Sequence, residues 1–345
     1  MAMRMTAVPA WQPLDCEKTA PQAMEACPAW QPASQSAPAT VASIVGLHGT
    51  VVCPESATLS DVADLLMAGD RSAAAVVGDD GAFLGAITEN DIARAYVEGS
   101  EEGHPSAAAA GIAAGAWLRS GMARCPASLA DAMTVGTGTL LCEAAEKLRV
   151  MALGDSACRH LVVRDKAGKF RGMLSSLDLA RALCDLGPGM EEAGRRIGGA
   201  AVADVMKPRA ALPTCPRGGT LGQALRSMLE ARQNCVLVTD ADFCPAAQGI
   251  VTPRDALRAF VEHVPLDVTV GHWLRGLQSA LLPRVVAPDM RLARAAQVMA
   301  RHSVHHLVAV SPVTGDVEGV VSSCDVAHAV GSAERVVVGY GPRDS

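Results

Sequence analysis

Aromatic side chains are scarce in this chain of 345 residues: Phe, Trp and Tyr together make up 3% of it. Because half of the residues are nonetheless hydrophobic, the core must be built from Val, Leu, Ala and Met. No run of about 18 uninterrupted apolar residues occurs, which argues against a membrane span. There is no long basic run either, and the formal charge is −6, so we expect neither nucleic acid nor an anionic membrane as the main partner.

The sequence also lacks the spacings of metal and catalytic motifs. Its 11 cysteines include no Cys-x-x-Cys pair, which is typical of reduced thiols in an intracellular protein. The segment HSVHH clusters His302, His305 and His306, but no Cys or carboxylate completes a tetrahedral zinc site, so we predict no metal. No Gly-x-Ser-x-Gly or His-Glu-x-x-His motif is present. These motifs therefore give no indication of an enzyme, and we expect no catalytic cofactor.

The N-terminal region does not have the charged-then-apolar layout of a secretory signal. Its acidic Asp15, Glu17 and Glu25 are unusual for a transit peptide. We therefore predict a cytoplasmic protein and leave a nuclear or plastid location open. Residues 1–42 are rich in Pro, Ala, Gln and Ser, and because that composition cannot bury enough apolar surface, we predict a disordered tail.

Internal repetition is the strongest feature of the remaining sequence. ITENDIARAYVE at 87–98 corresponds to VTPRDALRAFVE at 251–262. A longer segment that begins at Arg159 corresponds in the same way to one that begins at His305, and the tripeptide WLR recurs between the repeats. These correspondences divide the chain into four units, named A, B, A′ and B′ in chain order, at about 43–98, 125–186, 200–263 and 282–332.

Each unit has the same order of local signals. A short extended stretch is followed by an amphipathic helix, a hairpin and a second short helix, which is a β-α-β-β-α pattern. Thr58 and Asp61 have the spacing of a helix capping box, and Asp80-Gly81 suits the tight turn of a hairpin. The expected fold class is therefore α/β (α+β), built from four such repeats.

A single unit of about 55 residues exposes one apolar sheet face and is marginal alone, so we expect the units to pair. A stretch rich in Gly and charge separates units B and A′. The predicted organisation is a first pair at 43–186, a linker at 187–199, a second pair at 200–332 and a C-terminal tail at 333–345.

The hairpin of every unit ends in Gly-x-x-[Thr/Ser]-x-x-Asp, followed three residues later by a basic or imidazole side chain. Ser/Thr-x-x-Asp at the start of a helix is a capping box, so the motif has a purely structural interpretation. The same geometry also favours a ligand. A helix N-terminus attracts phosphate, and an acidic side chain there can accept hydrogen bonds from a ribose diol. Both interpretations stay open at this point.

In these motifs and their fourfold recurrence the chain resembles cystathionine β-synthase (CBS) domains, two of which form a Bateman module. Four-repeat chains of this kind are similar to the γ regulatory subunit of AMP-activated and SNF1-related kinases. The resemblance covers about residues 43–332 and implies that AMP, ADP, ATP or an S-adenosylmethionine-like ligand binds between paired units. It implies that ribose is bound by Asp91, Asp178, Asp255 and Asp325. It implies that phosphate is approached by Thr88, Ser175, Thr252, Ser322, Arg94, Arg181, Arg258, His328, Arg159, His160, His305 and His306.

The four predicted sites differ just before the first strand of the hairpin. Units B and B′ have Arg or His there, whereas Ser72 and Asn234 stand at the corresponding positions of units A and A′. We therefore expect Asp178 and Asp325 to mark the strongest sites. Because aromatics are few, adenine would have to lie among aliphatic side chains such as Val135, Leu212 and Val286.

The resemblance implies a non-catalytic regulatory protein that senses adenosine nucleotide and transmits its occupancy to a partner such as a protein kinase. One alternative is an interaction scaffold with degenerate sites. Less expected is a regulatory module of an enzyme of the IMP dehydrogenase type, because no stretch between the repeats is long enough for a catalytic domain. The four units form either one intramolecular disc or, through association of two chains, a homodimer.

Overall fold

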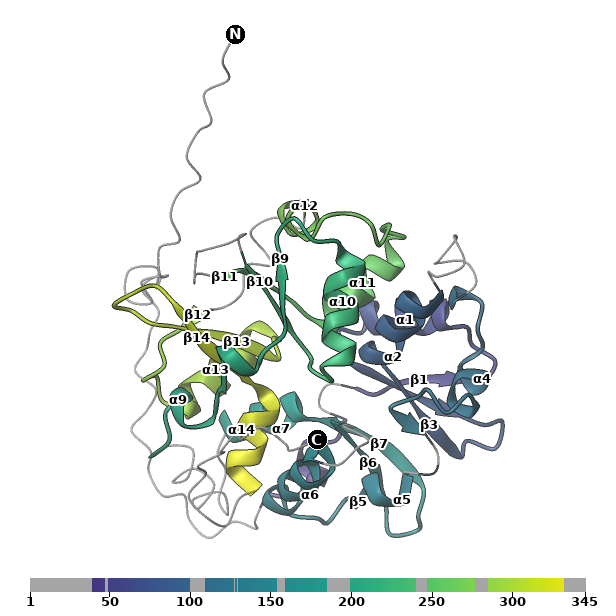
Figure 1. Cartoon of the computed structure of the whole chain (residues 1–345). Coiled ribbons are helices and arrows are strands. Elements are labelled where there is room, and N and C mark those ends of the chain that lie inside the picture. Colours follow the sequence, from purple (N-terminus) through teal and green to yellow (C-terminus); the bar gives the residue numbers. More distant parts are fainter. Residues whose placement is uncertain are drawn as a thin grey trace.

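The computed structural model describes residues 39–46, 49–99, 109–126, 128, 130–153, 159–184, 199–239, 247–276 and 285–331. Most of the predicted N-terminal tail, nearly all of the predicted linker and the C-terminal stretch lie outside these ranges. Figure 1 shows the described helices and strands in sequence colours.

Units A and B have the predicted β-α-β-β-α order. In each of them the first strand is parallel to the second, and the second is antiparallel to the third. Unit A contains β1 (Val51–Pro54), α1 (Leu59–Ala68), β2 (Ala73–Val77), β3 (Phe83–Thr88) and α2 (Glu89–Glu98). Unit B contains β5 (Thr134–Gly136), α6 (Leu141–Leu153), β6 (His160–Arg164), β7 (Phe170–Ser175) and α7 (Ser176–Cys184).

Units A′ and B′ repeat this order with the same strand directions. Unit A′ contains β9 (Thr214–Pro216), α10 (Leu221–Glu230), β10 (Val236–Thr239), β11 (Ala247–Val251) and α11 (Pro253–Val261). Unit B′ contains β12 (Val285–Val286), α13 (Leu292–His302), β13 (His306–Val310), β14 (Val317–Ser322) and α14 (Ser323–Gly331). The predicted fold class, a mixed α/β chain of four repeats, is therefore confirmed.

Local hydrogen bonds explain where the helices and turns begin. The Thr58 hydroxyl accepts the Asp61 N–H, and an Asp61 carboxylate oxygen accepts the Thr58 N–H, so the predicted capping box starts α1. The hairpin of unit A turns at Gly81, whose φ of 75° lies in the left-handed region that glycine adopts without strain.

In each pair, a short strand of one unit joins the sheet of the other unit. In the first pair, β4 (Cys125–Pro126) joins the sheet of unit A beside β3. A Cβ on Gly85 would lie 3.0 Å from the Cys125 carbonyl oxygen, which is why the motif begins with glycine there. In the second pair, β8 (Lys207–Pro208) joins β14 of unit B′. The remaining short elements are η1 (Val41–Ser43), α4 (Ala114–Arg119), α5 (Ala130–Met133), α9 (Val202–Val205), η4 (Arg209–Ala211) and α12 (Val270–Gly276).

Part of the segment assigned to the tail is packed against unit B. The Val41 N–H donates to the Thr139 carbonyl at 2.8 Å, and Thr40 forms an isolated bridge with Leu140. Val41 is fully buried in the hydrophobic core. The folded part of the chain therefore includes residues 39–42, which compositional reasoning had assigned to the tail because those four residues alone carry no periodic signal.

Two kinds of contact close the four units into a ring. Within each pair the sheets face each other: Phe83 of unit A stacks on Phe170 of unit B at 5.4 Å, and Leu237 of unit A′ shares a cluster with Val308 of unit B′. Between the pairs the helices pack, α2 against α11 and α13 against α7. The green helices α10 and α11 therefore lie beside α1 and α2 in Figure 1. The described residues form the intramolecular four-unit arrangement, one of the two expected.

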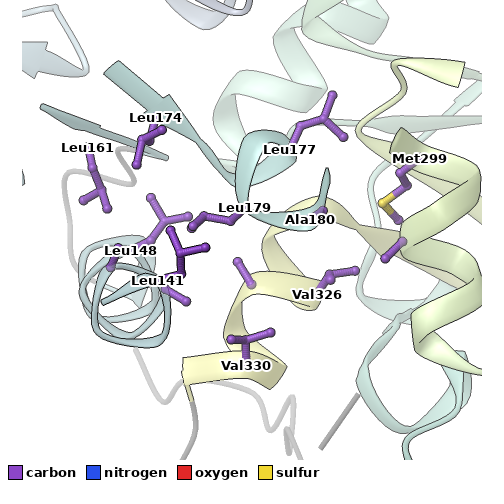
Figure 2. Packing of buried hydrophobic residues seen from close by; sticks show 14 of the residues in the cluster. Leu141, Leu148, Leu161, Leu174, Leu177, Leu179, Ala180, Met299, Val326 and Val330 are labelled. Atoms are coloured by element: carbon purple, nitrogen blue, oxygen red, sulfur yellow. The ribbon is translucent and has the colours of Figure 1, made fainter. Parts of the chain in front are cut away.

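The helical interface between units B and B′ is aliphatic. Figure 2 shows Leu148 and Leu179 of unit B packed toward Val326 and Val330 of unit B′. All four side chains are almost completely buried. The interface between units A and A′ instead contains an aromatic pair, Tyr96 and Phe260, edge to face at 5.6 Å. These interfaces bring the N-termini of helices from different pairs toward one another.

Among the described helices, we find none with the length and hydrophobicity of a membrane span.

The prediction that the cysteines are reduced thiols holds only in part. Among the described cysteines, Cys53, Cys142, Cys215, Cys235 and Cys324 are free thiols, whereas Cys125 is disulfide-bonded.

Candidate central anion site

A cavity of about 210 Å³ lies where the four units meet. The second helix of every unit (α2, α7, α11 and α14) begins at its wall. Their first residues, Glu89, Ser176, Pro253 and Ser323, all line it. Because a helix N-terminus presents backbone N–H groups and a partial positive charge, the convergence of four of them favours an anion.

Basic side chains surround the same cavity. The predicted phosphate residues Arg159, His160, His305 and His306 all line it. No described carboxylate pairs with Arg159. Arg124 also lines the wall, and its buried Nε has no hydrogen-bond partner among the described residues.

Burial and neighbouring cationic groups lower the pKa values of the three histidines in the cavity wall. Burial lowers the pKa of His160 to about 4 and that of His306 to about 3, and the nearby Arg159 guanidinium contributes to both shifts. Burial, and then the neighbouring His306, lower the pKa of His305 well below its usual range. A phosphate in the cavity would oppose these shifts, because an adjacent anion favours the protonated imidazole.

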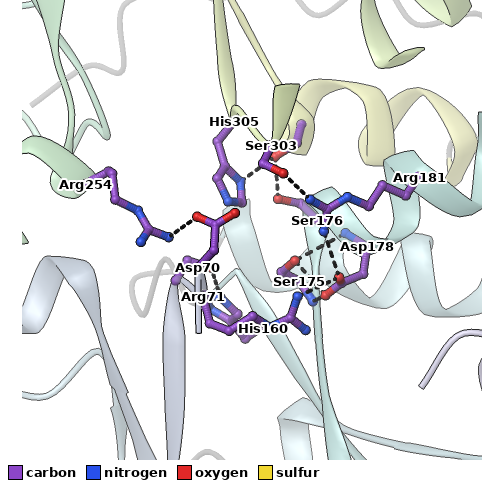
Figure 3. A network of polar contacts seen from close by, with 12 residues as sticks. Asp70, Arg71, His160, Ser175, Ser176, Asp178, Arg181, Arg254, Ser303 and His305 are labelled. Atoms are coloured by element: carbon purple, nitrogen blue, oxygen red, sulfur yellow. Dashed lines mark hydrogen bonds and ion pairs between the residues drawn. The ribbon is translucent and has the colours of Figure 1, made fainter. Parts of the chain in front are cut away.

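Hydroxyl groups connect these imidazoles to neighbouring units, both within a pair and between the pairs. His305 Nδ1 lies 3.0 Å from Ser323 Oγ, which in turn lies 2.7 Å from Ser176 Oγ of unit B. His160 Nε2 lies 2.9 Å from Ser72 Oγ of unit A. Figure 3 shows His305 and Ser176 approaching each other from different units. The polar groups of the cavity wall therefore form contacts between units as well as within them.

The motif aspartates all cap their own helices through one oxygen. In each unit Oδ2 accepts the N–H and the hydroxyl of the Thr or Ser three residues earlier, at 2.5–2.8 Å. These Thr and Ser residues therefore have the role that the structural interpretation predicts. Whether an aspartate also faces a ligand depends on its other oxygen, Oδ1, and on its surroundings.

Two of the four aspartates are closed in by neighbouring residues. Oδ1 of Asp91 accepts the Trp117 indole N–H at 3.3 Å and the Arg124 backbone N–H at 2.9 Å, and the residue is completely buried. Oδ1 of Asp178 lies 3.3 Å from Arg71 Nη1 and 3.7 Å from Arg181 Nη1 (Figure 3). The cleft beside Asp178 measures only about 20 Å³.

Asp255 is placed differently, since it lines the central cavity itself. No hydrogen bond reaches its Oδ1 from any described residue. Asp325 lines neither the central cavity nor the cleft at Asp178. From the sequence we expected Asp178 and Asp325 to mark the strongest sites, because units B and B′ have Arg or His just before the first strand of the hairpin. Arg71 and Trp117, which lie outside the motif, close in Asp178 and Asp91, and Asp255 is the motif aspartate that lines the central cavity.

The remaining predicted residues divide between the cavity and the helix surfaces. Thr88, Thr252 and Ser322 line the central cavity, and Ser175 lines the small cleft. The basic residues one turn into the helices are directed elsewhere. Arg94 pairs with Glu98 at 3.8 Å, and Arg181 donates to Ser303 Oγ at 2.8 Å. Arg258 acts electrostatically on Asp255, and burial lowers the pKa of His328. None of these last four lines the central cavity.

The predicted adenine neighbours Val135, Leu212 and Val286 are buried and do not line the central cavity, whose apolar lining includes Ile250 and Val304. Sequence reasoning also missed Arg254, which follows Pro253 inside the motif of unit A′. Its only sequence signal is a basic side chain between the motif Thr and Asp. Among the described residues, no group of three His, Cys, Asp or Glu side chains could hold a metal ion.

The sequence matches the model of the CBS domain four times, over residues 47–98, 128–185, 202–262 and 283–332. No curated protein sequence matches the chain. Among solved structures, a protein from Methanocaldococcus jannaschii, described as a proposed archaeal homologue of γ-AMPK, is similar with a TM-score of 0.62 at 13% identity. The similarity covers 84% of this chain and 99% of that one, and it concerns the fold alone.

Two further solved structures match over a smaller part of the chain. A CBS domain protein from Pyrobaculum aerophilum complexed with AMP is 24% identical over 36% of this chain and 89% of its own, with a TM-score of 0.32. The CBS domain of a bacterial CNNM/CorC family Mg²⁺ transporter in complex with ATP is 21% identical over 41% of this chain and 94% of its own, with a TM-score of 0.34. Because the four family matches span more than half of the sequence and coincide with the four units of the fold, the chain belongs to the CBS-domain family.

Proposed function

We propose that this protein is a non-catalytic sensor that binds an adenosine nucleotide, with the phosphates in the central cavity, and transmits occupancy to a partner such as a protein kinase. The observation that carries the proposal is the central cavity itself, where four helix N-termini meet Arg124 and Arg159. Neither guanidinium has a described carboxylate partner. Two guanidinium groups without a carboxylate partner, together with four helix N-termini, favour the binding of an oxyanion.

The ribose of the nucleotide is assigned to Asp255. Its Oδ2 holds the helix cap, and its Oδ1 is left to accept a hydrogen bond from a sugar hydroxyl. Thr252 and Ile250 line the cavity beside it. Burial raises the pKa of Asp255, and hydrogen bonds from Thr252 oppose that shift.

The position of the cavity between the two pairs supports transmission to a partner. A ligand there contacts α11 of one pair and α7 of the other, so its binding free energy depends on how the pairs pack. A partner that prefers one packing must change nucleotide affinity by the same factor as the nucleotide changes partner affinity.

A scaffold function has a specific observation in its favour. The carboxylates of Asp91 and Asp178 are satisfied by Trp117, Arg71 and their own caps, so these two crevices have the structure of helix caps. We therefore assign sensing to the Asp255 side of the cavity. The regulatory module of an enzyme of the IMP dehydrogenase type has no observation that favours it.

Thermal unfolding with AMP, ADP, ATP and S-adenosylmethionine tests the proposal. A ligand that binds only the folded state raises the melting temperature with concentration, by the equivalent of about 2.7 kcal/mol at 100 times its Kd. Asp255→Asn should abolish the rise. Asp178→Asn weakens the same kind of cap in a closed cleft, so it serves as the matched control and should keep the rise. The sensing proposal is wrong if no nucleotide changes the melting temperature of the wild type, or if both variants behave alike.

A further inference from the structure

The four helices at the central cavity differ at their first residue. Three begin with uncharged residues, Ser176, Pro253 and Ser323, whereas α2 begins with Glu89. The Glu89 side chain is buried and lines the cavity together with the cations described above. A carboxylate in a wall otherwise suited to phosphate requires an explanation, because like charges repel most strongly where water is excluded.

Glu89 is held by an arginine from the other pair. Its Oε1 lies 2.6 Å from Arg254 Nε. Arg254 Nη2 also lies 3.6 Å from the exposed Asp70, and its Nη1 lies 3.5 Å from the Leu66 carbonyl oxygen. Glu89 therefore neutralises one of the guanidiniums that line the cavity and fixes its direction. Among the described lining residues, the two carboxylates of Glu89 and Asp255 oppose the guanidiniums of Arg124, Arg159 and Arg254.

We propose that Glu89 makes the cavity selective for the charge of the phosphate tail, favouring a nucleoside monophosphate over a triphosphate. The inference rests on the proposed function and names the ligand class of that same cavity. The repulsion between a fixed carboxylate and the ligand increases with every charge that the ligand adds. Holding Arg254 in an ion pair has the same effect, because that guanidinium is then less able to neutralise a longer tail.

Binding of AMP and of ATP, measured by calorimetry without divalent ions on the full chain, tests this assignment. The assay is run at about pH 8, because burial raises the pKa of Glu89 to about 7 and its carboxyl group is ionised above that value. Glu89→Gln keeps the shape of the side chain and removes its charge. We expect the ratio of ATP affinity to AMP affinity to rise on the order of tenfold or more, since two added charges each interact with the carboxylate across the cavity.

Two further variants keep the test specific. Asp70→Asn removes the other carboxylate that reaches Arg254, but Asp70 is 64% exposed and does not line the central cavity, so the ratio should stay within about twofold of wild type. Glu89→Ser introduces the residue found at this position in units B and B′, and it should shift the ratio as Glu89→Gln does, even if the glutamine variant folds poorly.

The outcomes separate the two proposals. If the wild type binds neither nucleotide, the sensing function itself is wrong. If the wild type binds both and the ratio is unchanged in Glu89→Gln and Glu89→Ser, the assignment of charge selection to Glu89 is overturned while the sensing function stands. An equal change in Asp70→Asn would also overturn it, because the effect would then come from Arg254 alone.

Discussion

Replacing Glu89 with Gln should change how the stability of the protein depends on pH. Burial raises the pKa of Glu89 from 4.5 to about 7, with Arg254 opposing the shift and the nearby Asp255 and Asp70 adding to it. A carboxyl group whose pKa is higher in the folded state binds its proton more tightly there. The wild type therefore loses stability as the pH rises from the unfolded pKa to the folded pKa, and glutamine, which does not titrate, is free of this loss.

The magnitude follows from the two pKa values. One pH unit of difference corresponds to about 1.4 kcal/mol, so the interval gives a loss on the order of 3 kcal/mol between about pH 4.5 and pH 7. Below this interval Glu89 is neutral in both folded and unfolded states, and Glu89→Gln should have nearly the stability of wild type. Above it, the variant should be more stable by that amount, although it loses the ion pair with Arg254.

Urea unfolding at about pH 4.5 and about pH 8 measures the two differences in the free energy of unfolding. Titrating groups that do not interact with Glu89 affect wild type and variant alike, so their contributions cancel in the comparison. Asp70→Asn is the control, since it removes an exposed carboxylate that also lies close to Arg254. A difference between wild type and Glu89→Gln that is the same at both pH values would refute the reasoning, because Glu89 would then titrate normally in the folded protein.

Two further predictions concern residues outside the cavity. Trp117→Phe removes a hydrogen bond to the buried Asp91 carboxylate and should lower the free energy of unfolding by about 1–3 kcal/mol. Trp273→Phe, at the corresponding WLR position where the indole N–H has no partner among the described residues, should cost less, and equal costs in chemical unfolding would contradict the assignment. Phe260→Ala, which empties the space beside Tyr96 between the pairs, should cost about 3–5 kcal/mol in the same assay. A cost below about 1 kcal/mol would mean that the pairs are held together elsewhere.

The four copies of one motif have acquired different surroundings. Asp91 and Asp178 are held by Trp117 and Arg71 respectively, whereas Asp255 faces the cavity. Copying preserves a local hydrogen-bond pattern because its partners travel with the copied segment. It does not preserve partners contributed by another unit, such as Arg71 of unit A beside Asp178 of unit B.

The local architecture of this protein was determined by the sequence alone. Four β-α-β-β-α units and the caps that start their helices could be predicted because periodicity and Thr/Ser-x-x-Asp spacing act over a few residues. The positions of the cavity imidazoles could also be predicted from the sequence, since His160 and His305 lie at or directly before the start of recognisable strands.

Only the tertiary structure decided which motif carboxylate faces the cavity. The Arg71–Asp178 pair spans 107 residues of sequence, and Arg254 reaches Glu89 from the other pair of units. Such contacts depend on how sheets and helices of different units pack, and no pattern within a single unit encodes that geometry. Short-range hydrogen bonds therefore account for the predictable part of the site, and long-range packing accounts for its selectivity.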